Sequence, residues 1–137
     1  MSARTKARLR ALDILFEADQ RGLNAEALLD ERLPDPDSRA GNNPYTAQVV
    51  RGVVARWQDI NAALTDYSQG WTLDRMPAVD RAILRIGAWE VLFNDEIPDA
   101  VAISEAVALA TELSTDESPS FVNGLLARLS EVKATIV

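Results

Sequence analysis

Four cations near the start of the chain suggest the first chemistry. Residues 1–10 contain no acidic residue but hold Arg4, Lys6, Arg8 and Arg10. Cations at a helix N-terminus oppose the helix dipole, so stability alone would favour acids there. Two interpretations remain open at this point: a solvated helix end, or an arm that grips the phosphate groups of a nucleic acid.

A second candidate lies in residues 118–129 (SPSFVNGLLARL). We expect Ser118 to cap a helix that Pro119 opens, and the unpaired amides of its first turn would form an anion site. Phe121 falls at the margin of the apolar face of this helix. It is either a core residue or a partly exposed ring on which an unpaired base stacks, an interaction worth about 1–3 kcal/mol.

A third candidate lies in residues 79–90 (VDRAILRIGAWE). Arg81 and Arg85 share one line of the predicted helix, and such a line is usually a solvated face. Glu90 instead falls among apolar positions, where a carboxylate must be paired or neutralised. We expect it to form a structural ion pair or to accept a capping hydrogen bond rather than to bind a ligand.

The composition excludes several kinds of chemistry. The chain has 137 residues and contains neither cysteine nor histidine, which excludes disulfides, thiol nucleophiles and imidazole acid–base catalysis. No glycine-rich phosphate loop follows a strand, and no acidic cluster has metal-ligand spacing. We therefore expect a protein that is not an enzyme and has no cofactor and no metal.

The charge distribution and the hydropathy limit the partners. The net charge is −7, and residues 11–137 hold ten basic and 21 acidic residues. Such a body argues against a general nucleic-acid coat but allows a short, defined site. No apolar run approaches the roughly 20 residues of a membrane span, and residues 1–20 lack the apolar block of a secretory signal. The sequence predicts a cytoplasmic protein without a membrane partner.

Helical periodicity dominates the elements that must position these residues, and no segment alternates long enough for a convincing strand. The sequence predicts an all-α domain of six or seven helices. We expect helices at about 4–20, 24–33, 44–67, 78–93, 101–113 and from 118 onwards. Residues 34–43 (PDPDSRAGNN) are turn formers and form the obvious loop.

Several segments together resemble the NusB family of bacterial transcription antitermination factors. The resemblance covers most of residues 4–132, and residues 21–42 add nothing to it. It is carried by KARLRALDILFEAD (6–19), NPYTAQVVRGVV (43–54), VDRAILRIGAWEVL (79–92), IPDAVAISEAVALAT (97–111) and SPSFVNGLLARL (118–129). It implies a single RNA-binding domain over 1–137 in which two small helical bundles, about 1–68 and 74–137, pack across each other.

The resemblance also implies a function and a set of site residues. Members bind boxA-type single-stranded RNA of ribosomal RNA leaders together with NusE, a small-subunit ribosomal protein, and the complex joins the elongating RNA polymerase. Phe16 and Asp80 match the NusE-facing surface. The positions that match the RNA-binding surface are Arg4, Lys6, Arg8, Arg10, Arg81, Arg85, Glu117, Ser118, Phe121 and Asn123. This sequence departs from the family at Thr111 and at Ser114-Thr115, where the family tends to have a lysine followed by a Phe-Gly pair.

Two alternatives to this function stay open. The same helical module is similar to the front domain of certain RNA cytosine methyltransferases, where it serves as an RNA-binding appendage. The chain could also be a module that binds only proteins, because one lysine near the presumed RNA path is absent. The sequence does not decide whether the chain forms a homodimer that covers its RNA surface.

Overall fold

The computed structural model describes residues 2–136, and within them the chain forms seven α-helices, two short 3₁₀ helices and no strand. This result confirms the predicted all-α class. The contacts divide the chain into two compact units, one ending at Ala55 and the other beginning at Arg56. Nowhere in residues 2–136 does a helix combine the length and the apolar character needed to cross a bilayer.

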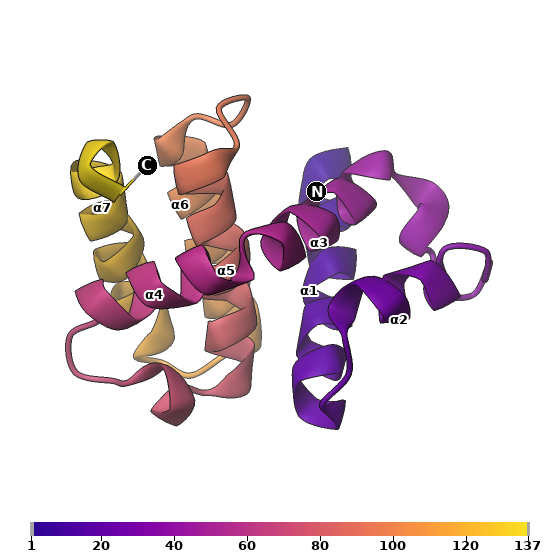
Figure 1. The fold of residues 1–137 in the computed structure, drawn as a ribbon, viewed down its shortest axis with the longest axis horizontal. Helices are drawn as coiled ribbons and strands as arrows, with labels where there is room; N and C mark the ends of the chain where they lie inside the picture. Colours follow the sequence, from indigo (N-terminus) through magenta and orange to yellow (C-terminus); the bar gives the residue numbers. More distant parts are fainter. Residues whose placement is uncertain (1, 137) are drawn as a thin grey trace. The chain divides into compact units, whose positions relative to one another are not determined.

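The first unit contains α1 (Ala3–Arg21), α2 (Ala25–Arg32), η1 (Ala40–Asn42) and α3 (Pro44–Ala55), with α2 and α3 each packed on α1 (Figure 1). Local signals set its helix ends. The Ser2 side chain accepts a hydrogen bond from the Thr5 amide, and Gly22 ends α1 in the left-handed conformation. The core is formed by Leu12, Leu15, Leu28, Leu29, Val49, Val50 and Val53.

The second unit contains α4 (Trp57–Tyr67), η2 (Leu73–Arg75), α5 (Ala78–Phe93), α6 (Asp99–Leu113) and α7 (Ser118–Ile136). Helices α5, α6 and α7 pack against one another, and α4 lies across α5 and α7 (Figure 1). Gly87 permits a close approach of Leu126 on α7 to α5. A Cβ atom there would lie 2.6 Å from Leu126 Cδ1. Helix α5 is buried along nearly its whole length and forms the centre of the unit.

The prediction of one continuous helix over 44–67 is wrong. Arg56 has φ −114° and ψ 24°, outside the helical region, and it separates α3 from α4. The apolar periodicity continues across this break, since Val53 and Ile60 are seven residues apart and both are buried. Val53 nevertheless belongs to the first unit and Ile60 to the second, because the chain divides between Ala55 and Arg56. This division lies earlier in the sequence than the expected one near residue 68.

Candidate functional site

Two of the four N-terminal cations lie against one aromatic ring. The guanidinium carbon of Arg4 is 5.0 Å from the centroid of the Tyr45 ring, and that of Arg8 is 5.6 Å from it. Arg4 is exposed, whereas Arg8 is only 2% exposed. Arg8 therefore packs within the first unit, and Arg4 presents its charge at the surface.

The other two cations, Lys6 and Arg10, line a hollow of about 230 Å³. Arg39 lines the same hollow, as do the side chains of Asn42 and Asn43, and no acidic residue does. We call this feature the cationic hollow. The sequence analysis missed Arg39 because it lies in the loop 34–43, where only turn propensity was visible. The structure thus brings two predicted site residues together with a third cation that was not predicted.

Phe121 is partly exposed, so the interpretation of a ring sealed in the core is wrong. Its ring centroid lies 4.9 Å from that of Trp71, with an angle of 64° between the planes. The two rings line an open pocket of about 240 Å³ together with Gln69, Gly70 and Glu117. We call this pocket the aromatic notch. An edge-to-face pair at this distance is a stable arrangement that leaves ring surface available to a third planar group.

The loop that carries Trp71 is held by specific contacts. The Ser68 hydroxyl donates a hydrogen bond to the Trp71 carbonyl, and Gly70 adopts a positive φ of 100°. Arg128 Nε on α7 donates a 3.0 Å hydrogen bond to the Tyr67 carbonyl at the end of α4. Trp71 was missed from the sequence because the segment 68–72 was interpreted only as a helix break, although an aromatic residue in such a break was a usable signal.

Asp80 and Ser118 are both fully buried in the second unit. Ser118 Oγ donates a 2.8 Å hydrogen bond to Asp80 Oδ2, and Ser114 Oγ donates a 2.5 Å hydrogen bond to Asp80 Oδ1. Ser118 is therefore not the side-chain cap that the sequence suggested but the first residue of α7 itself. Its neighbours Glu117 and Asn123, by contrast, are exposed.

The two arginines of α5 are held by their own unit rather than forming a fully solvated line, with Arg85 buried and Arg81 half-exposed. Arg81 Nη1 donates a 2.9 Å hydrogen bond to the Met76 carbonyl. Arg85 is 7% exposed, and its Nε donates a 3.0 Å hydrogen bond to Asn61 Oδ1. The Arg85 guanidinium also lies 4.2 Å from the centroid of the Trp57 ring. The structure thus gives both arginines roles in holding α5 within its unit.

Glu90 and Phe16 complete the set of singled-out residues. Glu90 is only 1% exposed, and among the described residues no buried side-chain nitrogen or oxygen lacks a hydrogen-bond partner. Phe16 is half-buried on α1 in the first unit. No group of three or more metal-ligating side chains occurs in the described part of the chain.

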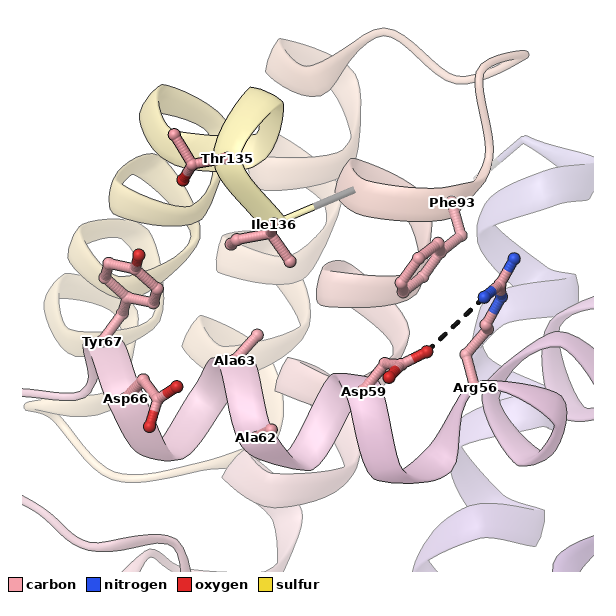
Figure 2. A pocket seen from close by; sticks show the side chains of 9 residues that line it. All are labelled: Arg56, Asp59, Ala62, Ala63, Asp66, Tyr67, Phe93, Thr135 and Ile136. Atoms are coloured by element: carbon pink, nitrogen blue, oxygen red, sulfur yellow. Dashed lines mark hydrogen bonds and ion pairs between the residues drawn. The ribbon is translucent and has the colours of Figure 1, made fainter.

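A further hollow, of about 540 Å³, is lined by residues of α4 and of the ends of α5 and α7 (Figure 2). Figure 2 shows Arg56 directed at Asp59, 3.5 Å away, beside the Phe93 ring. The Arg56 guanidinium lies 4.7 Å from the centroid of that ring. Because the cation is already paired and already lies over the aromatic face, this hollow offers less to a phosphate or a base than the other two.

Comparisons with known proteins bear on these sites. The model of the NusB family matches residues 5–131. The transcription antitermination protein NusB of Arthrobacter sp. strain FB24 is 60% identical over 137 residues, covering 100% of this chain and 99% of that protein. The corresponding protein of Pseudarthrobacter chlorophenolicus is 59% identical over the same shares.

Solved structures agree with this match. NusB of T. maritima has a TM-score of 0.81 and 30% identity, covering 95% of this chain and 92% of that chain. NusB of Aquifex aeolicus in solution has a TM-score of 0.81 and 26% identity, covering 98% and 92%. The relatives are named as transcription antitermination proteins and not as enzymes, which confirms the expectation of a protein that is not an enzyme. The family model and the full-length identity together show that this chain belongs to the NusB family.

Proposed function

We propose that this protein is an RNA-binding transcription antitermination factor that binds boxA-type single-stranded RNA together with NusE and joins the elongating RNA polymerase in the cytoplasm. Its membership of the NusB family supports this function. One structure of similar fold, with a TM-score of 0.78 and 24% identity over 94% of this chain and 96% of that chain, is described as NusB and NusE in complex with double-stranded RNA. Those partners are named for that protein and are proposed here for this one.

The observation that carries the proposal is the aromatic notch. Single-stranded RNA is recognised mainly by stacking unpaired bases on aromatic side chains and by hydrogen bonds to the base edges. Phe121 and Trp71 offer two partly exposed rings at one open pocket. Glu117 and Gln69 line the same pocket and supply polar groups beside a stacked base.

The burial and the hydrogen bonds of the side chains reduce the set of residues that we propose to contact RNA. Exposed or half-exposed residues other than Arg81 are retained as proposed contacts. The buried residues, together with the half-exposed Arg81, whose guanidinium donates to backbone carbonyls, are proposed to position the contacting residues. The proposed RNA contacts are Arg4, Lys6, Arg10, Glu117, Phe121 and Asn123. The proposed positioning residues are Arg8, Asp80, Arg81, Arg85 and Ser118. Phe16 remains the proposed contact for NusE.

Fluorescence anisotropy with labelled boxA RNA, with and without NusE, tests this function. We expect Phe121→Ala to weaken binding by about 5- to 150-fold, which corresponds to the loss of one stacked base. Phe93→Ala is the matched control, because Phe93 is also half-buried in the second unit but lies under Arg56. Equal losses in both variants, or no loss in Phe121→Ala, would remove the base-binding assignment.

The protein-only alternative is favoured by one observation, namely that Arg8 and Arg85 are buried and that Arg81 donates its hydrogen bonds to backbone carbonyls of its own unit. It predicts tight NusE binding and equal competition by a scrambled RNA. A scrambled competitor in the same titration separates the two functions. The methyltransferase appendage has no such support, since the relatives match over 99% of their own length under the name NusB.

A further inference from the structure

We infer that the cationic hollow binds one phosphate group of the RNA backbone and that Arg39 is the third cation of this site. The inference rests on the proposed function and extends it to Arg39 in the loop 34–43. Neither the charge pattern of the sequence nor the family resemblance had indicated this residue. It is carried by the charge of the hollow, by the way its two walls are held, and by the conformation of Arg39.

The charge of the hollow favours an anion. In a protein of net charge −7, Lys6, Arg10 and Arg39 line one hollow that has no acidic residue in its lining. Among the described residues, no carboxylate forms an ion pair with Lys6 or Arg39. Asp13 lies one helical turn from Arg10 along α1 and is not part of the lining. The Asp13 carboxylate interacts electrostatically with Arg10, which leaves a surplus of positive charge on the hollow, and such a surplus is suited to phosphate.

One wall of the hollow is a loop fixed on both sides of Arg39. Ser38 Oγ donates hydrogen bonds to the carbonyls of Arg32, at 2.6 Å, and Asp35, at 2.9 Å. The same oxygen accepts a 3.3 Å hydrogen bond from the amide of Ala40, which is 2% exposed. Arg39 therefore lies between an anchored hydroxyl and a buried residue, so that little loop ordering is needed when a phosphate binds.

The opposite wall is formed by α1 and the start of α3, which are tied together. Asn43 Nδ2 donates a 3.3 Å hydrogen bond to the Ala3 carbonyl, while Asn43 Oδ1 accepts one of 2.9 Å from the Tyr45 amide. Thr46 Oγ1 donates a 3.1 Å hydrogen bond to the Ala7 carbonyl. These contacts hold the helix that carries Lys6 and Arg10 against the segment that carries Asn42.

The conformation of Arg39 points to use of its side chain. Arg39 has φ 58°, and it is the only residue other than glycine with a positive φ in the described chain. A side chain at this φ is unfavourable, and glycine would adopt it without strain. Such strain persists mainly where the surrounding structure imposes it, often at binding sites. Here an arginine stands at a position that backbone energetics would assign to glycine.

The lining also indicates which part of an RNA the hollow takes. No aromatic side chain lines it, so it offers no stacking surface for a base. It offers three cationic groups and the side-chain amide of Asn42, which forms no hydrogen bond with the other described residues, whereas the Asn42 backbone amide donates one to the Arg39 carbonyl. Phosphate oxygens accept hydrogen bonds from all of these groups, and phosphate contacts position a strand while base contacts select it.

Arg39→Gly removes the guanidinium without straining the loop, because glycine readily adopts the left-handed backbone conformation. We expect this variant to be at least as stable as the wild type and to bind boxA RNA about tenfold more weakly. The slope of log affinity against log salt should become shallower by about 0.7, the value for one phosphate of a single strand. Arg75→Ala is the control, because Arg75 is an exposed arginine of the second unit that is absent from both proposed contact sites.

A second measurement does not depend on RNA. In an NMR titration of the wild type, inorganic phosphate should shift the Arg39 Nε–H signal and the backbone amide signals of Gly41 and Asn42. Sodium chloride at equal ionic strength is the control. In Arg39→Gly the phosphate-induced shifts of Gly41 and Asn42 should be lost.

If Arg39→Gly keeps the wild-type RNA affinity and salt slope, the inference is overturned while the proposed function stands. If phosphate shifts these signals but RNA affinity does not depend on Arg39, the hollow binds free phosphate and the RNA assignment is overturned. If the wild type binds no RNA, the proposed function fails, and the RNA assignment of the hollow fails with it.

Discussion

Asp80 Oδ2 accepts a 2.8 Å hydrogen bond from Ser118 Oγ, and both side chains are completely buried. The contact joins the first turn of α5 to the first residue of α7. A second hydroxyl, from Ser114, satisfies the other carboxylate oxygen. Because Phe121 follows Ser118 by less than one helical turn, this buried carboxylate fixes the helix start that presents the aromatic notch.

Ser118→Ala should lower the free energy of unfolding by about 1.5–3 kcal/mol, since it removes one hydrogen bond to a buried carboxylate. Urea unfolding followed by circular dichroism measures the change. Ser120→Ala is the matched control on the same helix, because Ser120 is exposed and should change stability by less than about 0.5 kcal/mol. A similarly small change in Ser118→Ala would show that Asp80 does not depend on this hydroxyl.

Local chemistry made several elements predictable. Asn24 Oδ1 accepts a hydrogen bond from the Ala27 amide, and α2 begins at the next residue, as its sequence indicated. Helix α5 runs from Ala78 to Phe93, the range that its apolar spacing predicted. Caps and periodicity are properties of neighbouring residues, so they are visible without knowledge of the fold.

Contacts between distant residues were not predictable in this way. Arg8 and Arg85 are long cationic side chains that the sequence placed in solvent, yet each lies against an aromatic ring more than 25 residues away along the chain, Tyr45 and Trp57. Whether such a side chain turns inward depends on a partner that only the fold supplies. The role of Arg39 was not predictable either, because its loop is shaped by hydrogen bonds and not by a periodic pattern.

Arg85→Lys should destabilise the second unit by about 1–2 kcal/mol, because lysine keeps the charge but loses the planar group that lies over Trp57. A double-mutant cycle with Trp57→Ala should give a coupling free energy of about 0.5–2 kcal/mol. RNA affinity at a temperature where both proteins are folded should fall less than it does in Phe121→Ala, because Arg85 acts only through the residues that it positions. A loss of RNA affinity without a loss of stability would instead return Arg85 to the RNA contacts.

Two glycine substitutions should change the free energy of unfolding in opposite directions. At Gly87 a Cβ would lie 2.6 Å from Leu126 Cδ1, and Leu126 is fully buried, so Gly87→Ala should destabilise the protein by about 1–3 kcal/mol. At Gly124 a Cβ would meet only Arg128 Nη1, at 3.3 Å. Since that atom ends a flexible side chain, Gly124→Ala should gain up to about 1 kcal/mol of helix propensity. Thermal unfolding measures the change in melting temperature for both variants. Changes in the same direction would contradict the packing at Gly87 or at Gly124.

The ion pair between Asp99 and Lys133 should make stability depend on pH. Burial raises the pKa of the Asp99 carboxyl, but hydrogen bonds from Lys133 and Ser130 outweigh it and hold the pKa below the ordinary 3.8. The stabilisation is therefore complete above about pH 4 and is lost as the pH falls through the lowered pKa. Lys133→Met should raise the Asp99 pKa, which carboxyl NMR titration measures. An unchanged pKa would mean that Ser130 alone sustains the shift.

Trp71 offers a direct optical test of the aromatic notch. A base stacked against Phe121 would approach the Trp71 ring, whose centroid lies 4.9 Å from that of Phe121, and should change its fluorescence. We expect boxA RNA to quench tryptophan emission in the wild type and in Trp57→Phe, but not in Trp71→Phe. Because phenylalanine still offers a ring, Trp71→Phe should bind RNA within a few-fold of the wild type, whereas Trp71→Ala should bind clearly more weakly. Quenching that persists in Trp71→Phe would place the bound base elsewhere on the protein, since the remaining tryptophans, Trp57 and Trp89, do not line this pocket.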